Sequence, residues 1–264
     1  MTTKYKEKAN EIMKMLTQTM DIGVQLCCAT GSRAYGIADE SSDYDFIVVR
    51  ANTPKEILTC IQTTPVHRII GDIDLTIYPF NNFIKLLSKQ NPNLLEIFGL
   101  KSDDFFSITD NMKQILNSAN LFLSKKCASS YRGYAQSCYI DAKKLYMKSK
   151  EIHPTHFRKK AAKSMFECLR IYEQGTELFE TGKIRACVTD PEMAYTLMKV
   201  RAGEFLDNNL DPVNFHYENT MFRTFENCFD NAFKSTNLPD EPDYNAIEKL
   251  QMGFNQQIVL NYNL

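Results

Sequence analysis

Several features that would place this chain in a special class are missing. No apolar run is long enough to span a membrane and the first residues lack the apolar core of a signal peptide, so we expect a cytoplasmic protein without a membrane partner. The eight cysteines form no CxxC pair and the four histidines have no ligand spacing, which argues against a disulfide framework and a zinc site. No internal repeat or low-complexity tract is visible. The composition, 44% hydrophobic and 24% charged, is typical of an ordinary globular protein.

Net charge is also nearly absent, but its distribution is uneven. A formal charge of −1 argues against a generally cationic nucleic-acid binder. From Lys125 to Arg170, however, the chain is strongly basic, and from Glu204 onward it is acidic. A basic stripe could follow an RNA backbone, and a solvated helix face is the alternative interpretation.

A short segment joins a glycine-serine turn to two spaced carboxylates. Ten residues separate Gly31 and Ser32 from Asp43 and Asp45, which open the apolar run 46–49. Since side chains two apart in a strand share a face, the two carboxylates should lie side by side. Such hard oxygen ligands suit Mg²⁺ or Mn²⁺, and a glycine permits the sharp turn that points backbone N–H groups at a phosphate. The pattern predicts phosphoryl or nucleotidyl transfer.

A third carboxylate is expected from a strand over residues 73–78. There Asp74 stands between apolar neighbours that would bury it unless a ligand held it. If this strand pairs antiparallel with the first, Asp74 lies about 5 Å from Asp45, close enough for three carboxylates to share two metal ions. Asp72 is the reserve candidate, but it follows Gly71, where a turn is as plausible as a liganding position.

These motifs resemble the DNA polymerase β-like nucleotidyltransferase superfamily, and within it the nucleotidyltransferases grouped with RNA-repair genes. The segments that carry the likeness are 31–36, 42–45 and 91–96, with weaker continuations at 169–170 and 177–182. The family commonly has a histidine three positions before the arginine that corresponds to Arg170. This chain has Glu167 there.

The resemblance implies catalysis with two metal ions. One ion, held by Asp43 and Asp45, would grip a triphosphate, and a second, shared by these two and Asp74, would activate the attacking hydroxyl. The resemblance thus implies that Asp43, Asp45 and Asp74 are the catalytic and metal-ligating residues.

The same resemblance implies the nucleotide-binding residues. Ser32 and the backbone N–H groups near Gly31 would bind the β- and γ-phosphates. Arg33 would contact the triphosphate or an acceptor phosphate. A salt bridge that holds the turn against the sheet is the competing role for Arg33.

The implied activity is transfer of an NMP from an NTP, such as ATP, to a hydroxyl, with release of pyrophosphate. An RNA end, on a tRNA or a cleaved RNA, is the expected acceptor. Transfer to a protein or small-molecule hydroxyl is one alternative, and a catalytically silent binding module is another, although buried acids without a metal are costly to keep. The oligomeric state is open.

Periodicity along the chain predicts an α+β fold. A small mixed sheet with helices on one face should form a nucleotidyltransferase domain over residues 1–102, followed by an all-helical domain over 103–264. The expected strands are 24–29, 44–49, 67–70 and 73–78. The expected helices are 4–20, 54–61, one from 83 that Asn91 and Pro92 interrupt, 109–126, 128–149, 156–182, 190–205, 213–233 and 241–253.

Overall fold

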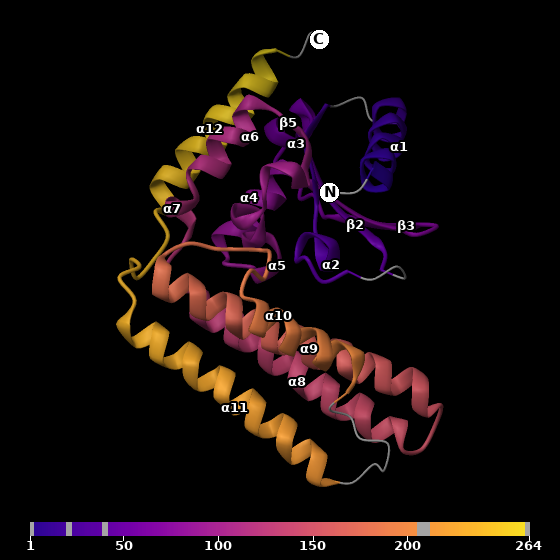
Figure 1. Cartoon of the computed structure of the whole chain (residues 1–264). Helices are drawn as coiled ribbons and strands as arrows, with labels where there is room; N and C mark the ends of the chain where they lie inside the picture. The colour runs from indigo at the N-terminus through magenta and orange to yellow at the C-terminus, as the bar shows by residue number, and fades with distance from the viewer. Residues whose placement is uncertain (1–2, 20–22, 39–41, 205–211, 262–264) are drawn as a thin grey trace. The chain divides into compact units, whose positions relative to one another are not determined.

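The computed structural model describes residues 3–19, 23–38, 42–204 and 212–261 (Figure 1). The chain divides into two compact units, which are described separately. The first comprises Met1–Gln90, Leu94–Phe122 and Pro242–Leu264, and the second comprises Asn91–Asn93 and Leu123–Glu241.

A five-stranded mixed sheet forms the centre of the first unit. Its strands are β1 (Val24–Ala29), β2 (Tyr44–Arg50), β3 (Val66–Ile70), β4 (Ile73–Pro79) and β5 (Phe105–Ile108). Their spatial order is β3-β4-β2-β1-β5. The pair of β2 and β4 is parallel, and the other pairs are antiparallel.

The expected antiparallel pairing of the two aspartate-bearing strands is therefore wrong. Between β2 and β4 the chain passes through α3 (Pro54–Leu58) and then β3, which forms a tight hairpin with β4. Because β3 occupies the edge and reverses at Gly71, β4 runs in the same direction as β2. A crossover of this kind is what a parallel pair requires.

Helices cover both faces of the sheet, and the expectation of helices on one face is also wrong. On α1 (Thr3–Thr19), the Tyr5 ring stacks on Phe46 at 4.9 Å between centroids. On α4 (Phe80–Ser88), Phe83 meets Tyr78, which pairs with Val49. Residues 46 and 49 point to opposite faces because side chains alternate along a strand. Figure 1 shows α1 and α4 on the two sides of the sheet.

The last helix of the chain packs into the first unit. On α12 (Tyr244–Leu260), Phe254 stacks on Phe80 with ring centroids 3.8 Å apart. Gln251 and Asn255 both donate to Oδ1 of Asn81. This unit therefore extends past the expected boundary at residue 102. It also contains α6 (Asp110–Asn117) and α7 (Ala119–Phe122).

Short helical turns complete the first unit and the segment by which the chain passes to and from the second unit. They are α2 (Gly31–Ala34), α5 (Pro92–Leu95), and the 3₁₀ turns η1 (Glu96–Gly99) and η2 (Ser102–Asp104). The expected helix interruption before Pro92 is present, since α4 ends at Ser88. Tyr35 is buried and its hydroxyl donates to Glu96 at 2.7 Å, which ties α2 to η1.

The second unit contains helices joined by loops, and no strand occurs among its described residues. It consists of α8 (Cys127–Ser149), α9 (Pro154–Thr181), α10 (Pro191–Ala202) and α11 (Pro212–Ser235). Tyr172 of α9 packs edge-on against Phe222 and Phe229 of α11 in its core. A mixed sheet followed by a helix-rich part confirms the α+β class. Within the described ranges, no helix has both the length and the apolar character needed to cross a bilayer.

Candidate functional site

Two of the predicted carboxylates face each other across parallel strands. The ladder pairs Asp45 of β2 directly with Asp74 of β4. Neighbouring strands lie about 4.8 Å apart, and directly paired residues point to the same face. Asp45 is partly buried and the side chain of Asp74 is 39% exposed, so this pair is open to ligands.

The remaining predicted carboxylate, Asp43, lies just before β2 and is exposed. It precedes Tyr44, whose backbone N–H donates to the carbonyl oxygen of Asp72 at 2.9 Å. Asp43 is thus two residues before Asp45 on the same segment, as the sequence spacing indicates.

Asp72 lies in the β-turn before β4 and not in the ladder. Its carboxylate accepts from the Lys8 ammonium at 2.8 Å. This hydrogen bond holds the pKa of the Asp72 carboxyl below its usual range. Of the two candidates for the third carboxylate, the register brings Asp74 and not Asp72 beside Asp45.

The turn after β1 approaches Asp45 closely. Gly31 has φ +67°, and a Cβ there would lie 1.9 Å from Oδ2 of Asp45. The backbone N–H of Thr30 donates to the Asp45 carbonyl oxygen at 3.0 Å. Only glycine therefore fits both the left-handed conformation and the space at position 31. Ser32 follows at the start of α2, partly buried.

The guanidinium of Arg33 faces the segment before β2. Nε donates to the carbonyl oxygen of Asp43 at 3.1 Å, and a terminal nitrogen donates to that of Ser42 at 2.6 Å. The same group lies over the Tyr44 ring, 4.0 Å from its centroid. These contacts hold the turn against the sheet, as the competing role for Arg33 requires, but through backbone carbonyls instead of a salt bridge. Its contact with a triphosphate stays a prediction.

A histidine that the sequence reasoning did not single out contacts the site. Nε2 of His67, on β3, lies 2.6 Å from Oδ1 of Asp74. The sequence feature that could have indicated His67 is the short hairpin over residues 66–79. Its register determines which β3 residues flank Asp74. Tyr5 was also missed, and its hydroxyl donates to the backbone oxygen of Asp45 at 2.7 Å.

The donor set is suited to a hard divalent cation. Asp43, Asp45 and Asp74 offer only carboxylate oxygens, which Mg²⁺ and Mn²⁺ prefer. Among the residues that the structure describes, no three His, Cys, Asp or Glu side chains already converge as a metal-binding group. The residues thus agree with such a cation in ligand type, and the strand register brings Asp45 and Asp74 side by side.

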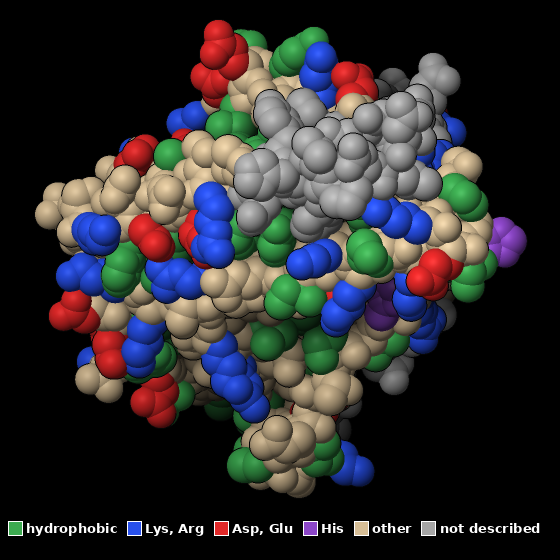
Figure 2. Space-filling view, turned by 90° about the horizontal axis from the view of Figure 1, so that it is seen from below, with side chains coloured by type: hydrophobic (Ala, Val, Ile, Leu, Met, Phe, Trp, Pro, Cys, Tyr) green, Lys and Arg blue, Asp and Glu red, His purple; other side chains and the backbone are tan. Residues whose placement is uncertain are grey.

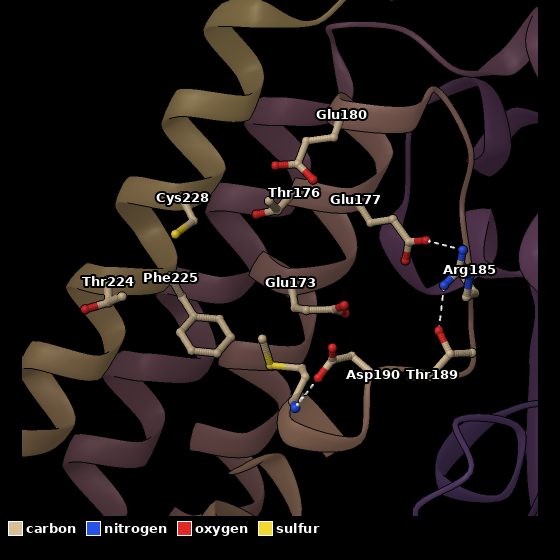
Figure 3. A pocket seen from close by; sticks show the side chains of 11 residues that line it. Glu173, Thr176, Glu177, Glu180, Arg185, Thr189, Asp190, Thr224, Phe225 and Cys228 are labelled. Carbon is tan, nitrogen blue, oxygen red and sulfur yellow. Dashed lines mark hydrogen bonds and ion pairs between the residues drawn. The ribbon is translucent and has the colours of Figure 1, made fainter. Parts of the chain in front are cut away.

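The helical unit contains a separate cavity of about 410 Å³ (Figure 3). Its lining residues are Glu173, Thr176, Glu177, Glu180, Arg185, Thr189, Asp190, Met193, Thr224, Phe225 and Cys228. Figure 3 shows Arg185 between Glu177 and Thr189, with hydrogen bonds or ion pairs to both. Burial, followed by the charge of Glu177, raises the pKa of Glu173 to about 7.

The position where the family commonly has histidine holds an ion pair in this chain. Glu167 accepts from Nε and from a terminal nitrogen of Arg170, at 3.0 and 2.9 Å. Arg170 is only 2% exposed, so this contact compensates a buried charge. The departure from the family pattern therefore has a local structural role.

Two of the comparisons with known proteins give no argument about function. None of the curated proteins matches this sequence. Among solved structures, a nucleotidyltransferase-like protein from Exiguobacterium sibiricum 255-15 is 10% identical, with 85% of this chain and 74% of that chain covered and a TM-score of 0.32. A likeness that low carries no argument.

The family comparison is decisive. The model of the RlaP family, described as the RNA repair pathway DNA polymerase beta family, matches residues 5–253. This match includes the turn, all three aspartates and the whole helical unit, and it confirms the resemblance inferred from the motifs. The chain belongs to the RNA repair pathway DNA polymerase beta family and is a nucleotidyltransferase.

Proposed function

We propose that this nucleotidyltransferase moves an NMP from an NTP, such as ATP, to a hydroxyl at an RNA end, with Mg²⁺ or Mn²⁺. One observation carries the proposal: Asp45 and Asp74 are paired on neighbouring strands, and the Gly31 turn lies directly against Asp45. A phosphate-binding turn beside paired carboxylates is the arrangement that phosphoryl-transfer chemistry needs.

Each residue has a distinct role in this proposal. Asp43, Asp45 and Asp74 would hold the divalent cations, which neutralise charge on the carboxylates and the triphosphate. Ser32 and the backbone at Gly31 would bind the β- and γ-phosphates. Because a side chain at position 31 would collide with Asp45, the glycine allows the turn to lie directly against that carboxylate.

The transfer itself exchanges one phosphorus–oxygen bond for another. The acceptor hydroxyl oxygen bonds to the α-phosphorus as its proton passes to water. The bond from the α-phosphorus to the oxygen that bridges to the β-phosphate breaks. Pyrophosphate leaves with that electron pair, and the NMP stays on the acceptor.

Two observations favour RNA as the acceptor. The family description places its members in RNA repair. In the helical unit, the hairpin of α8 and α9 exposes six lysines, Lys143, Lys144, Lys148, Lys159, Lys160 and Lys163. On the face drawn in Figure 2, Lys and Arg side chains lie along the surface with Asp and Glu side chains between several of them. In the proposal, the exposed lysines of the hairpin bind RNA phosphates with release of counterions.

A labelling experiment tests the proposal. The protein is incubated with each of the four α-³²P-labelled NTPs, with Mg²⁺ or Mn²⁺, and with separate RNA and protein fractions of a cell extract. Label in the RNA fraction, dependent on the divalent cation, is the expected result. Label in the protein fraction would replace RNA by a protein acceptor, and no label in any fraction would contradict the proposal.

A further inference from the structure

The row of paired residues through the candidate site continues to the edge of the sheet. In the ladder, Asp45 pairs with Asp74, and Asp74 pairs in turn with Ile69 of β3. The three side chains therefore share one face and follow one another across β2, β4 and β3. All five residues of β3 are exposed, so this end of the row is open.

The phosphate-binding turn lies at the other end of the same row. It follows β1, which pairs with β2 on the side opposite β4. The position of a Cβ on Gly31 is 1.9 Å from Asp45 Oδ2, so the turn contacts Asp45 itself. The carboxylates of Asp45 and Asp74 consequently stand between the turn and β3.

The direction of the reaction follows from this order. In phosphoryl transfer the attacking and leaving oxygens are roughly in line, on opposite sides of the phosphorus. If the turn holds the β- and γ-phosphates, the leaving pyrophosphate is on the turn's side. The attacking hydroxyl must then approach from the side of β3.

We propose that the exposed edge strand β3 is the acceptor-binding wall of the active site, with Ile69 in contact with the terminal nucleoside of the RNA acceptor. This inference rests on the proposed function. Ile69 is 71% exposed, so its side chain offers apolar surface to a ribose or base. The neighbouring carboxylate of Asp74 supplies the negative charge of the site.

His67 lies on the same face of β3 and supports the assignment. Residues 67 and 69 are two apart, so both side chains point toward the Asp74 side. The 2.6 Å contact between His67 Nε2 and Asp74 Oδ1 fixes one carboxylate oxygen. His67 is therefore a positioning residue for Asp74.

The strand supplies its own control. Val66 is also apolar, β-branched and exposed, at 46%, but it pairs with Ile77 and points to the opposite face. Ile69→Ser and Val66→Ser thus make the same kind of change on one strand, and only the first alters the proposed wall.

Steady-state kinetics with bulk tRNA and the preferred NTP test the assignment. We expect Ile69→Ser to raise KM for tRNA about tenfold, the effect of losing an apolar contact, with KM for the NTP unchanged. Val66→Ser should keep both values. Circular dichroism melting of the variants verifies that they fold.

Equilibrium binding of fluorescently labelled tRNA provides a second measurement that needs no turnover. The dissociation constant should rise about tenfold for Ile69→Ser and stay constant for Val66→Ser. Equal behaviour of the two variants in both measurements would overturn the acceptor wall. A parent protein that transfers no label would overturn the proposed function, and the binding data would still test the wall.

Discussion

In the candidate site, Gly31 and Asp45 lie in close contact. The backbone at Gly31 occupies the space beside the Asp45 carboxylate, and no side chain would fit between them. A residue with a Cβ at that position would combine left-handed strain with a steric clash. The site is therefore sensitive to single methyl groups.

Replacement of Gly31 by alanine isolates this clash when it is compared with Gly71→Ala. Both glycines have positive φ, +67° and +62°, but a Cβ at Gly71 meets nothing within 4 Å. Left-handed strain should cost each variant about 1–2 kcal/mol of unfolding free energy. Only Gly31→Ala should also lose NTP binding, measured by isothermal titration calorimetry. Equal NTP affinity in the two variants would contradict the close approach.

The raised pKa of Glu173 predicts a pH-dependent stability. The ordinary glutamate value is 4.5, and the value in the folded protein is about 7, because burial and Glu177 outweigh the favourable charges of Arg170 and Arg185. Between these pH values the folded state binds more protons than the unfolded state. The free energy of unfolding therefore falls as pH rises from 4.5 through 7, because Glu173 loses its proton in the folded protein.

Glu173→Gln should therefore stabilise the protein at pH 8 by about 3 kcal/mol and change little at pH 4. Urea unfolding at the two pH values measures this difference. Glu180→Gln, an exposed change on the same helix and in the same cavity, is the matched control. A stabilisation of Glu173→Gln that is the same at both pH values would show that Glu173 does not titrate as described.

Among the elements, the strands that carry the site were largely predictable. Residues 24–29, 44–49 and 73–78 alternate or cluster apolar side chains between turn signals, and each forms a strand within one residue of the expected limits. Asp74 was also expected beside Asp45, although through an antiparallel pairing that the structure does not have. The catalytic and metal-binding roles of these residues stay predictions.

The direction of β4 and the existence of β5 were not predictable from local patterns. Both the parallel and the antiparallel arrangement place Asp74 beside Asp45, and only the course of residues 51–72 decides between them. The four-residue strand β5, with the sequence Phe-Phe-Ser-Ile, gives too short a pattern to separate strand from helix, and pairing with β1 determines its conformation.

The α8–α9 hairpin makes a testable prediction about RNA. If its lysines bind the acceptor, Lys159→Glu/Lys160→Glu/Lys163→Glu should weaken RNA binding and flatten the dependence of log affinity on log salt, while NTP binding survives. The control is the triple variant Lys6→Glu/Lys14→Glu/Lys55→Glu, which changes three exposed lysines and makes the same change in charge. This control should bind RNA with the parental affinity. Filter binding over a salt series checks this, and overlapping curves for the two variants would remove the hairpin from the RNA site.

The whole molecule should respond to its nucleotide. A ligand that binds only the folded state raises the free energy of unfolding by about 2.7 kcal/mol when its concentration is about one hundred times its dissociation constant. For a chain of this size, that raises Tm by about 5 °C or more. We expect this shift with NTP and Mg²⁺ together, and a smaller one with either alone. Calorimetric melting measures it, and the sheet-containing unit, which holds the three aspartates, should carry the shift. An unchanged Tm at saturating concentrations would argue against a nucleotide site there.

The most direct test of the account is label transfer by aspartate variants. Asp45→Asn and Asp74→Asn keep the size of each side chain and remove a ligand charge, so transfer from α-³²P-labelled NTP should fall at least about a hundredfold while the proteins stay folded. Asp110→Asn, which changes a carboxylate with a side chain that is 94% exposed on α6, should transfer label at the parental rate. Near-parental transfer by a folded Asp45→Asn protein would contradict the assignment of the active site.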